Sequence, residues 1–193
     1  MTSLNDRLIQ LERDLLANPV RISTYHDLPF AIFRYHPKDE FKMRKEIQLL
    51  STRIKNAGKN VEIISLAKIL WEAIERNDPI DNIIEDEKNF GFHKVQDIIY
   101  TYFTDADFTP LPDLLSEKLS KLNPKKHIAF IVRAGCLAPS IYPISQLMDH
   151  MQGKTEVPSI LFYPGCREEG YAGLRFMCMD NRATIGSYRV NIY

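Results

Sequence analysis

His127-Ile-Ala-Phe-Ile-Val-Arg-Ala-Gly135 and, downstream, Pro158-Ser-Ile-Leu-Phe-Tyr-Pro-Gly165 are two short apolar runs that each stop at a glycine. Their apolar residues follow one another without alternation, a pattern typical of strands that helices cover on both faces. The sequence therefore predicts an α/β fold with a parallel sheet. Ligands and partners of such sheets usually bind beyond the carboxyl ends of the strands. The first candidate site residues are accordingly Arg133, Gly135, Tyr163 and Gly165.

Two more strands and the helices around the sheet follow from similar patterns. Apolar runs at 29–35 and 61–66 predict strands, and the basic segment between them has one apolar face at helical spacing. Strand, helix and strand are expected to form one right-handed crossover unit. A first helix is predicted over 4–17, a crossover helix over 139–152, and a last, half-exposed strand over 187–193.

Four helical patterns fill residues 67–124, between the second and third strands. That interval is too long for a simple crossover, so it predicts a helical insertion on one side of the sheet. The expected architecture is a three-layer, mainly parallel sheet flanked by helices, in one domain over residues 1–193. A chain of 193 residues can bury one well-packed core, although two small domains are an alternative. Residues 165–181 show little periodicity and predict no element.

The charge of the chain is balanced overall but unevenly distributed. Lys and Arg number 25 against 25 Asp and Glu, which argues against direct nucleic-acid binding because that requires several basic side chains to displace counterions. Residues 38–59 hold seven basic and three acidic residues, whereas residues 72–113 hold three basic and eleven acidic ones. This polarity would orient a partner protein, or it reflects solvated helix faces of opposite sign.

The cysteines and the chain's hydropathy suggest a reducing compartment. No apolar run is long enough for a membrane helix and no signal-peptide pattern opens the chain, so we expect a cytoplasmic protein without membrane contact. Cys136, Cys166 and Cys178 share no metal-type spacing, which predicts reduced thiols. The five histidines form no His-x-x-x-His pair, so zinc would need ligands from distant segments. We expect neither a metal nor a cofactor.

Motifs of common catalytic sites do not occur. The chain lacks both the P-loop and the dinucleotide-binding glycine patterns, which argues against ATP hydrolysis. Cys166 follows a strand, as the nucleophile of cysteine phosphatases does. However, position 172 is Ala172 and not the arginine that closes such a loop.

Arginines near the predicted strand ends are the remaining candidates for binding: Arg133, Arg167 and Arg175. Three converging guanidiniums would hold a phosphate or the carboxylates of a partner. The alternative is that they pair with Glu168 and Glu169 in the same loop.

A further signal comes from stretches spread over nearly the whole chain: Pro29–Pro37 with the basic helix after it, Arg133–Gly135 with Pro139, Val157–Gly165, Gly173–Phe176 and Tyr188–Val190. The most specific part is Leu161-Phe-Tyr-Pro-Gly165 with Leu174-Arg-Phe176. Together they resemble the BrxB family of bacterial BREX phage-defence systems. The resemblance implies a small component encoded beside a methyltransferase, an ATPase and a PglZ-type phosphatase-fold protein, with no catalytic residues to carry over.

We therefore expect a noncatalytic assembly or adaptor subunit of a BREX-type antiviral complex, which binds other defence proteins through its strand-end crevice and charged faces. Arg and Tyr dominate desolvated protein contacts, so Arg133, Tyr163 and Arg175 are the expected hot spots. The full set of candidate partner- or phosphate-binding residues is Arg133, Gly135, Tyr163, Gly165, Arg167 and Arg175. The alternative is an enzyme that binds a nucleotide or phosphate with loop 165–173, where Glu168 or Glu169 would direct a metal or a water.

Overall fold

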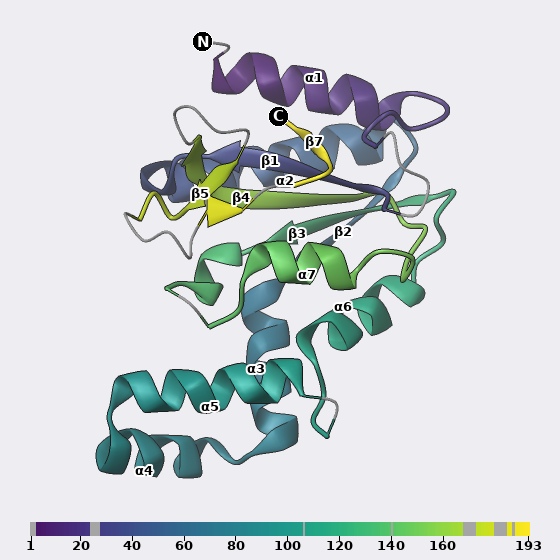
Figure 1. The fold of residues 1–193 in the computed structure, drawn as a ribbon. Coiled ribbons are helices and arrows are strands. Elements are labelled where there is room, and N and C mark those ends of the chain that lie inside the picture. Colours follow the sequence, from purple (N-terminus) through teal and green to yellow (C-terminus); the bar gives the residue numbers. More distant parts are fainter. Residues whose placement is uncertain are drawn as a thin grey trace.

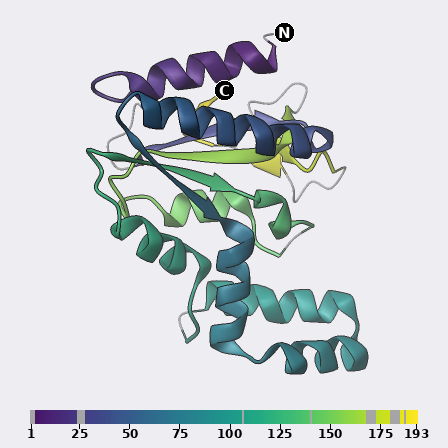
Figure 2. The ribbon, with the colours of Figure 1, turned by 180° about the vertical axis from the view of Figure 1, so that it is seen from behind.

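The computed structural model describes residues 3–23, 28–105, 107–139, 141–167, 173–179, 185–186 and 188–193. A mainly parallel sheet lies between two layers of helices (Figure 1), and the view from behind shows the same layers (Figure 2). The predicted three-layer α/β fold is confirmed.

The strands in chain order are β1 Phe30–Tyr35, β2 Asn60–Ser65, β3 His127–Val132, β4 Ser159–Arg167, β5 Leu174–Phe176, β6 Ile185–Gly186 and β7 Asn191–Ile192. The parallel part has the order β2-β3-β4-β1-β7, while β5 pairs antiparallel with the end of β4 and β6 with β5. β1 and β2 are therefore not neighbours, and the crossover between them passes over β3 and β4. The last strand is much shorter than the predicted 187–193.

The helices are α1 Leu4–Leu16, α2 Glu40–Asn56, α3 Leu66–Asn77, α4 Ile80–Phe90, α5 Phe92–Thr104, α6 Leu111–Ser120 and α7 Ile144–His150, with 3-10 turns η1 Pro37–Asp39 and η2 Ala134–Leu137. α1 and α2 cover one face of the sheet, and α3, α6 and α7 lie on the other (Figure 1). α7 begins later than the predicted residue 139 because Tyr142 precedes Pro143, and the residue before a proline avoids helical backbone angles.

Local sequence explains why α1 and α2 form on their face. The side chain of Ser3 accepts a hydrogen bond from the backbone of Asp6, while the Asp6 carboxylate accepts from the backbone of Ser3. This capping box satisfies two amide groups that a helix start leaves without partners. The buried residues of α2 recur at helical spacing and pack with α1 against the sheet: Met43, Ile47, Leu50 and Ile54.

The four helices α3 to α6 occupy the interval between β2 and β3, as the insertion prediction required. α4 and α5 form a hairpin that lies farthest from the sheet (Figure 1), and in α4 only Ile83 is buried. One hydrophobic cluster nevertheless joins Phe103 of α5 and Leu115 of α6 to Leu161 of β4. That shared core supports a single domain over 1–193, which stays a prediction. No helix in the described part of the chain is long and apolar enough to cross a membrane.

Candidate functional site

Two adjoining cavities open at the carboxyl ends of the parallel strands. The larger has a volume of about 510 Å³ and the smaller about 300 Å³. Glu40, Arg44, Ala67 and Arg133 line both of them, so the two form one continuous crevice. It lies where binding sites of open parallel sheets are expected.

Basic side chains from three different elements converge on this crevice. Arg44 comes from α2, Lys68 from the first turn of α3, and Arg133 follows β3 directly. Arg133 has a φ of 64°, a left-handed backbone conformation that is uncommon outside glycine and is enriched at functional sites. These three positive charges face one carboxylate, that of Glu40, among the lining residues of the larger cavity. The crevice is therefore chemically suited to an anion.

Glu40 is held in place by two neighbours. Arg44 donates from Nε to its carboxylate at 2.9 Å, and the hydroxyl of Tyr35 donates to its other oxygen. Burial raises the pKa of Tyr35 well above its usual range, and the hydrogen bond to Glu40 raises it further. Tyr35 is thus a fixed donor that orients Glu40 and is not a general base.

A second group of arginines lies near the carboxyl end of β1. Arg34 donates from Nη1 to the carbonyl of Gly165 at 3.4 Å, and burial together with the nearby charge of Arg167 lowers its pKa. Burial and the charges of Arg34 and Arg167 likewise lower the pKa of Arg7, which donates to the carbonyl of Arg34 at 2.6 Å. Arg7 and Arg34 were not predicted, because nothing in the sequence indicates that α1 and β1 bring their charges to Arg167.

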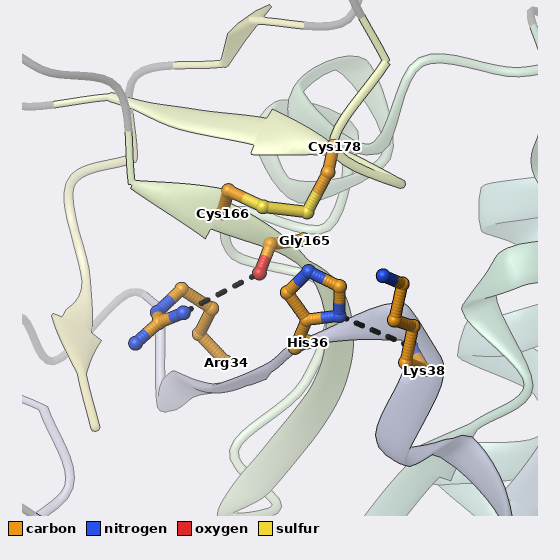
Figure 3. Close-up of a disulfide and its surroundings, with 6 residues drawn as sticks. All are labelled: Arg34, His36, Lys38, Gly165, Cys166 and Cys178. Atoms are coloured by element: carbon orange, nitrogen blue, oxygen red, sulfur yellow. Dashed lines mark hydrogen bonds between the residues drawn. A yellow bond between two sulfur atoms is a disulfide. The ribbon is translucent and has the colours of Figure 1, made fainter.

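Cys166 and Cys178 form a disulfide beside His36, with their Cα atoms 5.2 Å apart (Figure 3). The prediction of three reduced thiols was therefore wrong for this pair. It failed because β5 was not predicted, and the antiparallel pairing of β5 with β4 is what brings residue 178 back to residue 166. Cys136 is a free thiol that lines the smaller cavity, and burial raises its pKa to about 11.

Comparison with known protein families gives a match to the model described as BREX protein BrxB, over residues 62–191. The chain belongs to the BrxB family. This confirms the resemblance and places the protein in BREX phage-defence systems. No curated protein and no solved structure matches the chain. The matched range runs from β2 to β7, so it includes Arg133 of the crevice, whereas Glu40 and Arg44 lie outside it.

In this BrxB family member the predicted site residues lie in different places. Arg133 and Gly135 line the crevice as expected. Arg167 lies beside Arg34 instead of Arg133, and Arg175 pairs with Cys166 across the β4–β5 hairpin. The structure thus provides three basic groups at the crevice, of which only Arg133 is among the three predicted. Glu168, Glu169 and most of loop 165–173 lie outside the described residues.

Tyr163 and Gly165 lie in tightly packed surroundings in β4. The ring of Tyr163 is 0% exposed and packs on the rings of Phe176 and Tyr188, so it is not available to a partner. A Cβ atom on Gly165 would overlap the Tyr163 ring and lie 2.5 Å from the carbonyl oxygen of Arg175. The absence of a side chain at Gly165 therefore allows β5 to lie close to β4. The role of Gly165 in binding stays a prediction.

Proposed function

We propose that this protein is a noncatalytic assembly subunit of a BREX-type system, and that it binds another protein of the system through the α4–α5 hairpin. The observation that carries the proposal is the distribution of exposed apolar side chains. Nine large ones are exposed among the described residues, and six lie between residues 71 and 100: Trp71, Ile80, Ile84, Phe90, Phe92 and Tyr100. Five of the six belong to α4 and α5, and Trp71 belongs to α3. Such clustering in one part of a fold marks an interaction surface more often than chance exposure.

The tip of the hairpin carries the strongest part of this surface. Phe90 and Phe92 are 64% and 54% exposed, and they flank Gly91, whose φ of 83° makes the turn between the helices. A left-handed turn of this kind favours glycine. Burying each ring in a partner would contribute about 1.5–3 kcal/mol, so the two together would be strong candidates for hot spots.

The charge of the hairpin defines the chemistry of the partner. α4 holds four acidic residues, namely Asp81, Glu85, Asp86 and Glu87, against Lys88. The complementary surface is an apolar pocket with a basic rim, because opposite potentials steer association and exclude wrong partners. A stable complex would bury more than about 1,000 Å² in total.

Coexpression with the neighbouring BREX proteins, followed by size-exclusion chromatography, tests the proposal. We expect the wild type to coelute with one of them at micromolar concentration and the double variant Phe90→Ala, Phe92→Ala to elute alone. Phe41→Ala is the matched control, since Phe41 is 73% exposed but lies on α2, away from the hairpin. Unchanged coelution of the double variant, or a wild type that stays monomeric beside every neighbour, refutes the proposal.

A second candidate function rests on the crevice. Its three basic groups and its volume of about 510 Å³ suit a nucleotide or another phosphate compound. Thermal shift with ATP, GTP and inorganic phosphate, with and without Mg²⁺, should then raise the melting temperature, since a ligand at 100-fold excess over Kd contributes about 2.7 kcal/mol. Arg133→Gly removes the charge while keeping the left-handed backbone acceptable, and should abolish the shift. No shift with any of these ligands refutes this candidate.

A further inference from the structure

The disulfide lies within reach of solvent and next to a histidine. Cys166 and Cys178 are half-buried and His36 is exposed. The sulfur atoms and one ring nitrogen of His36 all lie within 4.8 Å of one another. A small thiol in solution can therefore approach the sulfur atoms, which is the first requirement for thiol–disulfide exchange.

The hydrogen bonding of His36 identifies which ring nitrogen carries the proton. Nδ1 accepts a hydrogen bond from the backbone N–H of Lys38 at 3.2 Å, where His36 caps η1. In the neutral ring the proton is therefore on Nε2. Figure 3 shows that this nitrogen points toward the disulfide. His36 thus presents an N–H donor to the sulfur atoms.

The surroundings of the disulfide favour a thiolate over a neutral thiol. Arg34 and Lys38 lie with His36 on the same side of the disulfide (Figure 3), and positive neighbours stabilise thiolates. Met177 and Cys178 have φ values of 53° and 54°. Two successive left-handed residues that are not glycine cost about 1–2 kcal/mol each, and such conformations cluster at functional sites.

We propose that Cys166 and Cys178 form a reversible dithiol–disulfide couple and that His36 assists the departure of the leaving sulfur. A thiolate of a dithiol reductant attacks one cysteine sulfur, the Cys166–Cys178 bond breaks, and its electron pair leaves on the other sulfur. That thiolate accepts the Nε2 hydrogen bond of His36. The second thiolate of the reductant then attacks the mixed disulfide, so that two electrons and two protons pass to the protein and the reductant becomes a cyclic disulfide.

The same three residues would suit a zinc ion, so the two possibilities must be compared. A histidine that binds a metal through Nε2 almost always donates a proton from Nδ1 to a second partner. Here Nδ1 is an acceptor, because the N–H of Lys38 points at it. Metal binding through Nε2 would therefore break the hydrogen bond by which His36 caps η1. Thiol–disulfide exchange leaves that hydrogen bond and the protonation of the ring unchanged.

The rate of reduction by dithiothreitol tests the role of His36. The Cys136→Ala background removes the third thiol. Native samples are alkylated at intervals, and the alkylated thiols per chain are counted by mass spectrometry. We expect two thiols to appear without denaturant and the disulfide to form again in air. His36→Asn keeps an acceptor for the Lys38 N–H but loses the Nε2 donor, and should slow reduction about tenfold. His36→Gln places an amide N–H near the Nε2 position and should restore most of the rate.

Three results would overturn the proposal. They are equal rates for wild type and His36→Asn at equal melting temperature, a disulfide that opens only in denaturant, and purified protein with one zinc per chain and no disulfide. The last result would assign the same residues to a metal.

Discussion

Alanine at position 165 should destabilise the protein strongly, whereas alanine at position 135 should not. Both glycines follow apolar strands and look alike in the sequence. In the structure a Cβ on Gly165 would overlap the ring of Tyr163 and approach the Arg175 carbonyl oxygen to 2.5 Å. On Gly135 its nearest neighbour would be Sδ of Met177 at 3.6 Å, an ordinary contact.

The loss of stability in Gly165→Ala depends on whether the groups around the new Cβ atom can move. The Arg175 carbonyl belongs to β5, and Tyr163 lies in the fully buried core, so neither can give way without separating β5 from β4. Overpacking of a well-packed interior costs about 1–3 kcal/mol and sometimes more. We expect about 3 kcal/mol for Gly165→Ala, which lowers the melting temperature by about 6–12 °C for a chain of this size. Gly135→Ala should stay within about 0.5 kcal/mol of wild type.

Urea denaturation of both variants, followed by circular dichroism, measures these differences. Equal midpoints for Gly165→Ala and Gly135→Ala would refute the packing argument. Gly165 would then be a candidate for a ligand loop again, and binding measurements on the variant would be the next step.

Three further predictions concern single side chains. Tyr163→Ala should lower the free energy of unfolding by about 3–5 kcal/mol in denaturant titrations, because it leaves a cavity in the core. A variant that is as stable as wild type but binds a partner more weakly would instead support the prediction of Tyr163 as a contact residue. The pKa of Glu72 is lowered by its hydrogen bond to Lys118 and by Arg76. The contribution of Glu72 to the free energy of unfolding is therefore fully present above the ordinary pKa of a glutamate, and it is lost as the pH falls through the lowered pKa. Glu72→Gln should destabilise the protein at about pH 6, and this deficit should shrink as the pH falls through the lowered pKa of Glu72; a deficit that stays constant from about pH 6 into acid contradicts this assignment. The Cys136 thiol, with its pKa raised to about 11 by burial, should react with iodoacetamide at about pH 8 far more slowly in the native protein than in urea; equal rates would mean that the thiol is exposed.

The fold was predictable where periodicity is long or an apolar run is complete. β3 and β4 lie where their apolar runs predicted, and the four helices α3 to α6 fill the interval 67–124 in which four helical patterns were predicted. The order β2-β3-β4-β1 was not predictable, because the sequence of a single strand does not indicate which other strand it pairs with. β3 and β4 are buried along most of their length, so their apolar runs suit any position inside the sheet. β5, of three residues, is too short to show a period.

The candidate site was predictable only in its location. Arg133 was found because it follows a strand directly, and that rule needs no knowledge of other segments. Arg44 and Lys68 were missed since they are surface-type residues of helices whose orientation depends on the tertiary packing. Cys166, Cys178 and His36 come from segments far apart in the sequence. The β4–β5 pairing brings Cys178 to Cys166, and the β1–β4 pairing brings His36 to them.

The strand order also has a consequence for synthesis of the chain. β1 pairs with β4 and β7, and β2 pairs with β3. Among the described strands, no pair can therefore form until residue 127 has left the ribosome, and β1 waits until residue 159. Before these points are reached, β1 and β2 have emerged from the ribosome but have no strand to pair with. Unpaired apolar strands favour aggregation and slow folding. The nascent protein should depend on early association of α1 with α2, or on a chaperone, until residue 159 has emerged.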